Sequence, residues 1–123
     1  MELENIVRQI KPCTMDELMI KNEKFIELYK EDKVCLLDVR MDFEQDIWAL
    51  SIAKHIQAPD VPDRLTELPK DKLIVVACPT LNRSSTVSAY LKTKGFNSKF
   101  LGEGLVNLMG QLKGKTAKEL RTL

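Results

Sequence analysis

The sequence contains little of what metal centres and disulfide scaffolds require. It has one histidine and three cysteines, Cys13, Cys35 and Cys78, with no Cys-x-x-Cys spacing. A zinc site built from Cys and His ligands is therefore not expected, and an odd number of cysteines argues against a disulfide framework. We expect no bound metal.

The chain also lacks an excess of charge of one sign and any long apolar run. It has 19 Lys and Arg against 18 Asp and Glu, a formal net charge of +1. Composition therefore gives no reason to expect nucleic acid or an anionic membrane as a partner. No apolar run is long enough to span a bilayer, and the first residues do not have the pattern of a signal peptide, so we expect a soluble cytoplasmic protein.

Apolar periodicity predicts strands that alternate with helices. Thr14 followed by Glu17 has the pattern of a capping box, which predicts a helix from about Met15 to Lys30 that Asn22 could divide in two. Alternation of this kind is typical of an α/β fold with a central, mainly parallel sheet of about four to five strands and helices on both faces. The predicted strands are 34–39, 52–56, 73–77 and 99–101; the predicted helices are 64–68, 84–94, 105–112 and 116–123, with 43–50 helical or irregular.

Cys78 is the strongest candidate for a reactive residue. It follows the apolar run 73–77 and opens a short polar loop, which leads to Ser84 and the helix predicted there. Backbone N–H groups at the start of a helix have no intrahelical partner and carry partial positive charge, so they favour a thiolate. Asp38 and Arg40 lie at the carboxyl end of another predicted strand; because ligands gather at the carboxyl ends of parallel strands, the three residues could share one rim of the sheet.

The length of the Cys78 loop limits what it can bind. Four residues separate Cys78 from Arg83. A loop of this size turns its amides toward the sulfur and forms a small anion-binding concavity. Cysteine-dependent phosphatases have five residues at this position, enough to surround a phosphate ester. The shorter loop is better matched to a cysteine that carries one additional sulfur atom, a persulfide.

Cys78 to Ser84 resembles the active-site loop of the rhodanese, or thiosulfate sulfurtransferase, family. Other parts of the chain resemble the same family in the same order, namely Leu36 to Arg40, Leu68 to Ala77, Tyr90 to Phe96 and Leu101 to Leu108. The resemblance covers about residues 13–113. It implies a rhodanese-like fold in which this core belongs to a single domain spanning residues 1–123.

The resemblance implies a sulfurtransferase. Cys78 would take a sulfane sulfur from a small anionic donor such as thiosulfate, or from a persulfide, and pass it to cyanide, a thiol or a protein acceptor. Asp38 and Arg40 would support the rim through hydrogen bonds, Arg83 would attract the donor or brace the loop, and no metal or organic cofactor is implied. The residues of the binding loop would be Pro79, Thr80, Leu81, Asn82, Arg83 and Ser84, whose N–H groups from Thr80 onward stabilise the sulfur anion.

Two residues of the loop depart from the family pattern. Many active members have glycine at the position of Leu81, and a residue with an N–H group at the position of Pro79. Proline removes one amide donor, and a non-glycine residue at Leu81 would cost about 1 kcal/mol if its φ were positive. These residues favour an alternative, a rhodanese-like binding or regulatory module with little or no turnover. A third hypothesis is a small cysteine phosphatase or arsenate reductase that depends on Cys78 and Arg83.

Four other residues have reactive or aromatic side chains, and we give each a structural interpretation. Cys35 lies inside an apolar run, where a thiol usually behaves as a small core hydrophobe. His55 and Trp48 have apolar neighbours, which favours packing over a role as general base or substrate contact. Cys13 could discharge a persulfide, but nothing in the spacing brings it close to Cys78, so we assign it no role.

Overall fold

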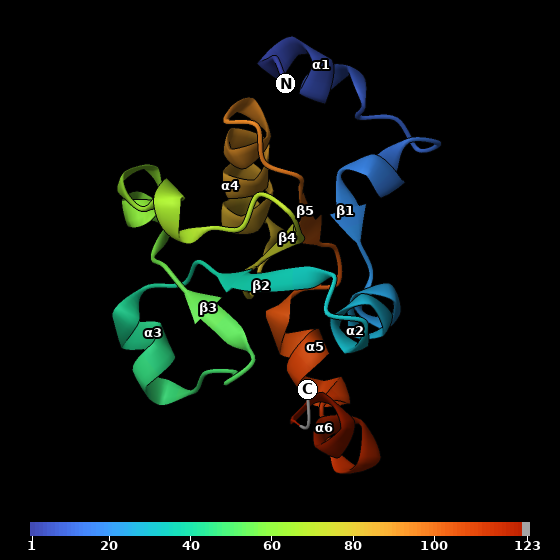
Figure 1. Cartoon of the computed structure of the whole chain (residues 1–123), viewed down its shortest axis with the longest axis vertical. Helices are drawn as coiled ribbons and strands as arrows, with labels where there is room; N and C mark the ends of the chain where they lie inside the picture. Colours follow the sequence, from blue (N-terminus) through green and yellow to red (C-terminus); the bar gives the residue numbers. More distant parts are fainter. Residues whose placement is uncertain (122–123) are drawn as a thin grey trace.

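The computed structural model describes residues 1–121, and its centre is a five-stranded sheet in which every pair of neighbouring strands is parallel (Figure 1). This confirms the predicted α/β class. The strands are β1 (Met19–Ile20), β2 (Val34–Asp38), β3 (Ala53–His55), β4 (Leu73–Ala77) and β5 (Ser98–Leu101). They lie in the order β1-β5-β4-β2-β3, which places β4 at the centre.

Helices precede the first strand, connect most of the strands and follow the last one. None of the helices within residues 1–121 is long and apolar enough to cross a membrane. The helix predicted at 116–123 begins earlier, at Gly114, and its predicted end lies outside the described residues. The α-helices are α1 (Leu3–Arg8), α2 (Asn22–Lys30), α3 (Asp42–Ile47), α4 (Leu81–Thr93), α5 (Leu105–Gln111) and α6 (Gly114–Arg121); the 3-10 helices are η1 (Met15–Glu17), η2 (Ala58–Asp63) and η3 (Leu65–Glu67).

Both faces of the sheet are covered, as predicted. Side chains alternate between the two faces of a strand, so β4 contributes to two separate clusters of buried residues. One cluster contains Ile74, Val76 and Cys78 with residues of α4 and η2, and the other contains Val75 and Ala77 with residues of α2 and α5. The same alternation places Cys78 on the face of the sheet that α4 covers.

The helix predicted from Met15 to Lys30 does not form in one piece, and its first part is wrong; the division considered at Asn22 agrees with α2, which begins there. The Thr14 hydroxyl donates to the Gln9 carbonyl at 2.7 Å and makes no cap, so only the short η1 forms. Met19–Ile20 then pairs with Phe100–Leu101 as the edge strand β1. This long-range pairing overrides the local helical pattern, and α2 begins only at Asn22.

Helix α4 begins three residues earlier than predicted, at Leu81 instead of Ser84. Thr80 precedes it with extended backbone angles, φ −107° and ψ 177°. Leucine and arginine are good helix formers, and nothing requires Leu81 to leave the helical conformation. Among the described residues, Asp32 is the non-glycine residue with positive φ, so the strain considered for Leu81 does not arise.

Gly104 holds the start of α5 against the residue that follows β4. Its φ is +84°, a conformation that favours glycine. A Cβ atom at this position would lie 3.1 Å from the carbonyl oxygen of Pro79. The next amide, that of Leu105, donates to the carbonyl oxygen of Cys78 at 3.0 Å. Gly104 therefore permits a close approach that fixes the backbone of Cys78.

We predict that Gly104→Ala lowers the free energy of unfolding by about 2 kcal/mol, because it combines a strained φ with a close contact to backbone. Gly110→Ala is the matched control, since no heavy atom outside its helix lies within 4 Å of a Cβ there. We expect that control to leave stability unchanged or raise it by up to about 1 kcal/mol. Urea unfolding measures both values, and equal effects of the two substitutions would contradict the role of Gly104.

Candidate active site

The register between β2 and β4 brings the candidate residues to one rim of the sheet. Asp38 is paired with Ala77, and the Val39 N–H donates to the Ala77 carbonyl at 3.1 Å. The two strands therefore end side by side. Cys78 follows one strand end and Arg40 follows the other, as expected for a parallel pair.

Cys78 is fully buried at the junction between β4 and α4. Its sulfur accepts a hydrogen bond from the Ser84 N–H at 3.3 Å. The thiol itself donates to the carbonyl oxygen of Thr80. Both hydrogen-bond partners of the Cys78 sulfur are therefore backbone groups of the segment that follows β4.

The predicted ring of amides around the sulfur takes a different form. Among residues 1–121, the N–H group that donates to the Cys78 sulfur is that of Ser84, the fourth residue of α4. Leu81, Asn82 and Arg83 occupy the first helical turn, whose N–H groups have no partner within a helix and carry its partial positive charge. Most of the predicted loop is thus the first turn of α4. Its backbone N–H groups are the same kind of donor, and they could bind an anionic atom attached to the Cys78 sulfur.

Arg83 forms a two-pronged ion pair with Glu44 of α3. Its Nη1 lies 2.6 Å from Glu44 Oε1 and its Nη2 lies 3.1 Å from Oε2. Oε1 also accepts the Met41 N–H at 3.0 Å, which fixes the carboxylate at the start of α3. The hydrogen bonds to Arg83 lower the pKa of Glu44 to about 2, with smaller contributions from the Met41 N–H and the charge of Arg40. The same pairing raises the pKa of Arg83.

Glu44 is the site residue that the sequence analysis missed. It lies 39 positions from Arg83 in the chain, so no local pattern links the two. An available signal was its place in the first turn of a helix directly after the predicted strand end at Arg40, where a carboxylate is favoured by the helix dipole.

Asp38 and Arg40 form a buried ion pair at the same rim. Both side chains are 1% exposed, and Arg40 Nη2 lies 2.8 Å from Asp38 Oδ2. Asp38 Oδ1 also accepts the Arg40 backbone N–H at 3.0 Å. Arg40 Nη2 donates to the Trp48 carbonyl at 3.0 Å, and the guanidinium lies 4.0 Å from the centre of the Trp48 ring. This network connects the end of β2 to the segment after α3.

Among residues 1–121, the remaining candidates make no hydrogen bond with the Cys78 sulfur. His55 Nε2 is 2.9 Å from the Arg40 carbonyl oxygen, so the histidine takes part in the rim. Cys13 is exposed. Cys35 is half-buried and lines a surface hollow, so its assignment to the core is wrong. The reason is that the pairing of β3 with β2 begins only at Leu36, so the edge of β2 that faces β3 is uncovered at Cys35. Partial burial still raises the pKa of the Cys35 thiol.

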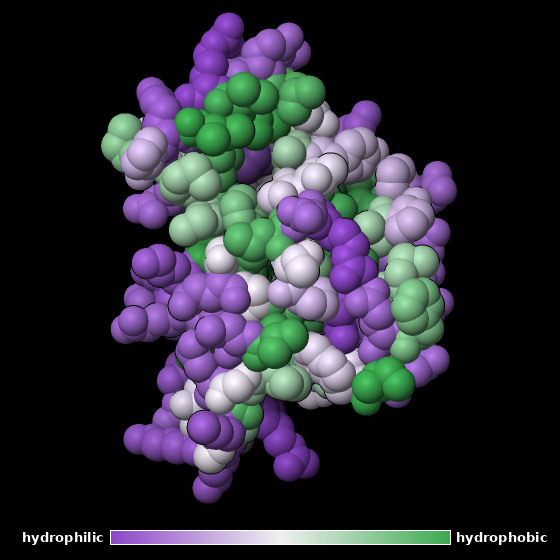
Figure 2. Space-filling view, turned by 180° about the vertical axis from the view of Figure 1, so that it is seen from behind, coloured by the Kyte–Doolittle hydropathy of each residue, from purple (hydrophilic) through white to green (hydrophobic). Residues whose placement is uncertain are grey.

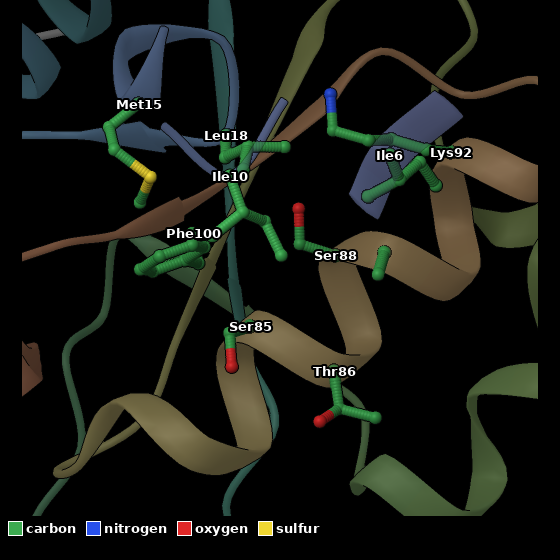
Figure 3. A pocket seen from close by; sticks show the side chains of 10 residues that line it. Ile6, Ile10, Met15, Leu18, Ser85, Thr86, Ser88, Lys92 and Phe100 are labelled. Atoms are coloured by element: carbon green, nitrogen blue, oxygen red, sulfur yellow. The ribbon is translucent and has the colours of Figure 1, made fainter. Parts of the chain in front are cut away.

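A separate pocket of about 370 Å³ lies between α4 and the N-terminal segment (Figure 3). Ile6, Ile10 and Phe100 line it together with Ser85 and Ser88 of α4. Apolar surface also gathers at this end of the molecule, near the top of Figure 2, where α1 lies. Cys78 is not among the lining residues, so this pocket is distinct from the candidate active site.

Comparison with known proteins identifies the family. The rhodanese-like domain family matches residues 21–111, and the chain therefore belongs to it. "Putative sulfurtransferase YtwF" of Bacillus subtilis (strain 168) is 34% identical over 107 residues, which cover 87% of this chain and 98% of that protein. These two findings support a role within the sulfurtransferase family.

Solved structures agree with this fold. A rhodanese-related protein of Thermoplasma volcanium matches with a TM-score of 0.68 and 22% identity, covering 76% of this chain and 92% of the other. A rhodanese-like domain protein of Staphylococcus aureus matches with a TM-score of 0.65 and 27% identity, covering 71% and 86%. The five-stranded parallel sheet is thus the rhodanese fold.

We predict that Asp38→Asn lowers the free energy of unfolding by about 3–5 kcal/mol, because it leaves the buried Arg40 charge without a counterion. The control is Glu27→Gln, which removes a carboxylate from an ion pair with Lys24 whose side chains are each 57% exposed. That substitution should cost less than about 1 kcal/mol. Urea unfolding compares them, and a small effect of Asp38→Asn would show that the buried pair does not hold the rim.

The Arg83–Glu44 pair should make stability depend on pH in the acid range. The pKa of Glu44 is about 2 in the folded protein, against 4.5 for its unperturbed value. Its contribution is therefore fully present above about pH 4.5 and is lost as pH falls toward 2. We expect the wild type to exceed Glu44→Gln in stability by a constant amount above pH 4.5, and this difference to shrink below it. Urea unfolding from pH 2 to 7 measures the difference; a pH-independent difference would contradict the pairing.

Proposed function

We propose that the protein is a sulfurtransferase in which Cys78 carries the transferred sulfur as a persulfide. The observation that supports this best is the Ser84 N–H donating to the Cys78 sulfur at the start of α4. A helix start beside a sulfur favours negative charge on it. Membership of the rhodanese-like family and the name of the Bacillus subtilis relative support the same activity.

The proposed reaction has two half-reactions. In the first, the Cys78 thiolate attacks the outer sulfur of thiosulfate; a new S–S bond forms, the bond to the sulfonate sulfur breaks, and sulfite leaves. In the second, cyanide or a thiolate attacks the outer sulfur of the persulfide, which gives thiocyanate or a new persulfide and regenerates the Cys78 thiolate. A persulfide donor would act in the same way, with a thiolate as leaving group. Ping-pong kinetics are expected for this sequence.

The site residues have distinct proposed roles. The N–H groups of residues 80–84 stabilise the outer sulfur anion, whereas Pro79 has no N–H to offer. The Thr80 carbonyl oxygen accepts the hydrogen bond of the Cys78 thiol. Asp38 and Arg40 keep the rim in place through their buried pair. The single domain over residues 1–123 and the cytoplasmic location stay predictions of the sequence.

A second candidate is a binding or regulatory module with little turnover. Two observations favour it. Cys78 is fully buried, and Arg83 is bound to Glu44 instead of being open to a substrate. The pairing of Arg83 also argues against a cysteine phosphatase or arsenate reductase, which would need that guanidinium for its oxyanion. We rank that third hypothesis last.

The persulfide can be detected by intact mass. After incubation with thiosulfate or glutathione persulfide, we expect an addition of about 32 Da that cyanide removes. Cys78→Ser should abolish the addition, whereas Cys13→Ser and Cys35→Ser, the matched controls, should retain it. Protein that stays unmodified with both donors, or that carries the sulfur on another cysteine, would favour the module instead.

A further inference from the structure

Both guanidinium groups at the rim already have an internal counterion. Arg40 is paired with Asp38 inside the core, and Arg83 is paired with Glu44 through both of its terminal nitrogens. An anionic substrate that approaches Cys78 must therefore compete with a carboxylate of the protein itself.

The Arg83–Glu44 pair is placed to influence chemistry at the sulfur. Arg83 belongs to the first turn of α4, directly before the Ser84 whose N–H contacts the Cys78 sulfur. Its side chain is 36% exposed and that of Glu44 is 24% exposed, so solvent and small solutes can reach the pair. The Met41 N–H holds the carboxylate in place, which makes its displacement by an outside anion less favourable.

We propose that Glu44 determines specificity by occupying the place on Arg83 that an anionic sulfur donor would take. Thiosulfate is a compact dianion whose sulfonate group needs a cation, whereas the persulfide of an uncharged thiol has no sulfonate and at most one negative charge. Glu44 therefore biases the site against thiosulfate and toward thiol persulfides as donors. The choice of sulfur donor rests on the proposed sulfurtransferase function. The effect of Glu44 on whether Cys78 reacts with charged or neutral reagents can be tested without assuming that function.

Alkylation of Cys78 by two reagents of similar size isolates the effect of charge. Iodoacetate is an anion and iodoacetamide is neutral; in both reactions the Cys78 sulfur forms a bond to carbon, the carbon–iodine bond breaks, and iodide leaves. Glu44→Gln keeps the shape of the side chain and frees Arg83 from its anion. We expect it to raise the ratio of the iodoacetate rate constant to the iodoacetamide rate constant by about tenfold, through attraction of the anion to the freed guanidinium.

The chain offers a matched control pair. Glu67 also binds an arginine through two nitrogens, with Arg64 Nε at 2.5 Å and Nη2 at 2.8 Å, and it has a second cation in Lys54 at 3.2 Å. Glu67→Gln removes the same charge and should leave the ratio within about twofold of the wild type. Glu44→Asp, which keeps the charge, should also keep the ratio low. All variants are made with Cys13→Ser and Cys35→Ser so that one thiol reacts, and circular dichroism checks that each is folded.

The outcomes separate the two proposals. A ratio that rises in Glu44→Gln alone, together with faster Cys78 persulfide formation from thiosulfate relative to the persulfide of 2-mercaptoethanol, an uncharged thiol, supports both proposals. An unchanged ratio overturns the role of Glu44, even if the wild type forms a persulfide. A raised ratio in a protein that takes up sulfur from neither donor supports charge selection by Glu44 and overturns the sulfurtransferase proposal.

Discussion

The hydrogen bond from the Ser84 N–H to the Cys78 sulfur is the interaction on which the rest of the site depends. It exists because β4 ends at Ala77 and α4 begins at Leu81, so the chain turns from strand to helix within three residues. This tight junction places the Cys78 sulfur at the N-terminal end of α4, a 13-residue helix. Within residues 1–121, the buried Cys78 sulfur is satisfied by backbone groups, without a second side chain as partner.

Two features keep the junction in place from opposite sides. On the β2 side, the buried Asp38–Arg40 pair fixes the neighbouring strand end, with the ring of Trp48 against the guanidinium. On the β5 side, Gly104 lets the start of α5 approach closely, so that an amide binds the carbonyl of Cys78. A buried ion pair adds little net stability over an apolar substitute, but losing one partner is costly. The network therefore fixes geometry more than it adds stability.

Much of the fold could be predicted from the sequence because the central strands are strongly marked. β2 is a short apolar run bounded by charges, and β4 is an apolar run that begins after Lys72; the predicted bounds of both agree with the structure nearly to the residue. Cys78 was found because it directly follows such a run. The parallel topology then implied that Asp38 and Arg40 lie at the same edge as Cys78, since all three residues are at or just beyond the carboxyl end of a strand.

The features that could not be predicted from the sequence depend on contacts between distant parts of the chain. β1 has two residues, too few to show periodicity, and forms only because Phe100–Leu101 pairs with it. Glu44 reaches Arg83 through tertiary packing of α3 near the rim, which no spacing in the sequence indicates. The exposure of Cys35 follows from where β3 begins, at Ala53, a boundary that side-chain patterns do not define.

The central claim is that amides at the start of α4 stabilise negative charge on a sulfur carried by Cys78. The most direct measurement is the ¹H–¹⁵N spectrum of the protein before and after treatment with a sulfur donor. The account predicts that the largest changes fall on the amides of residues 80–84, with the Ser84 proton moving downfield as its hydrogen bond to the anion shortens. Changes that leave these amides unaffected, or that centre on Cys13 or Cys35, would contradict it.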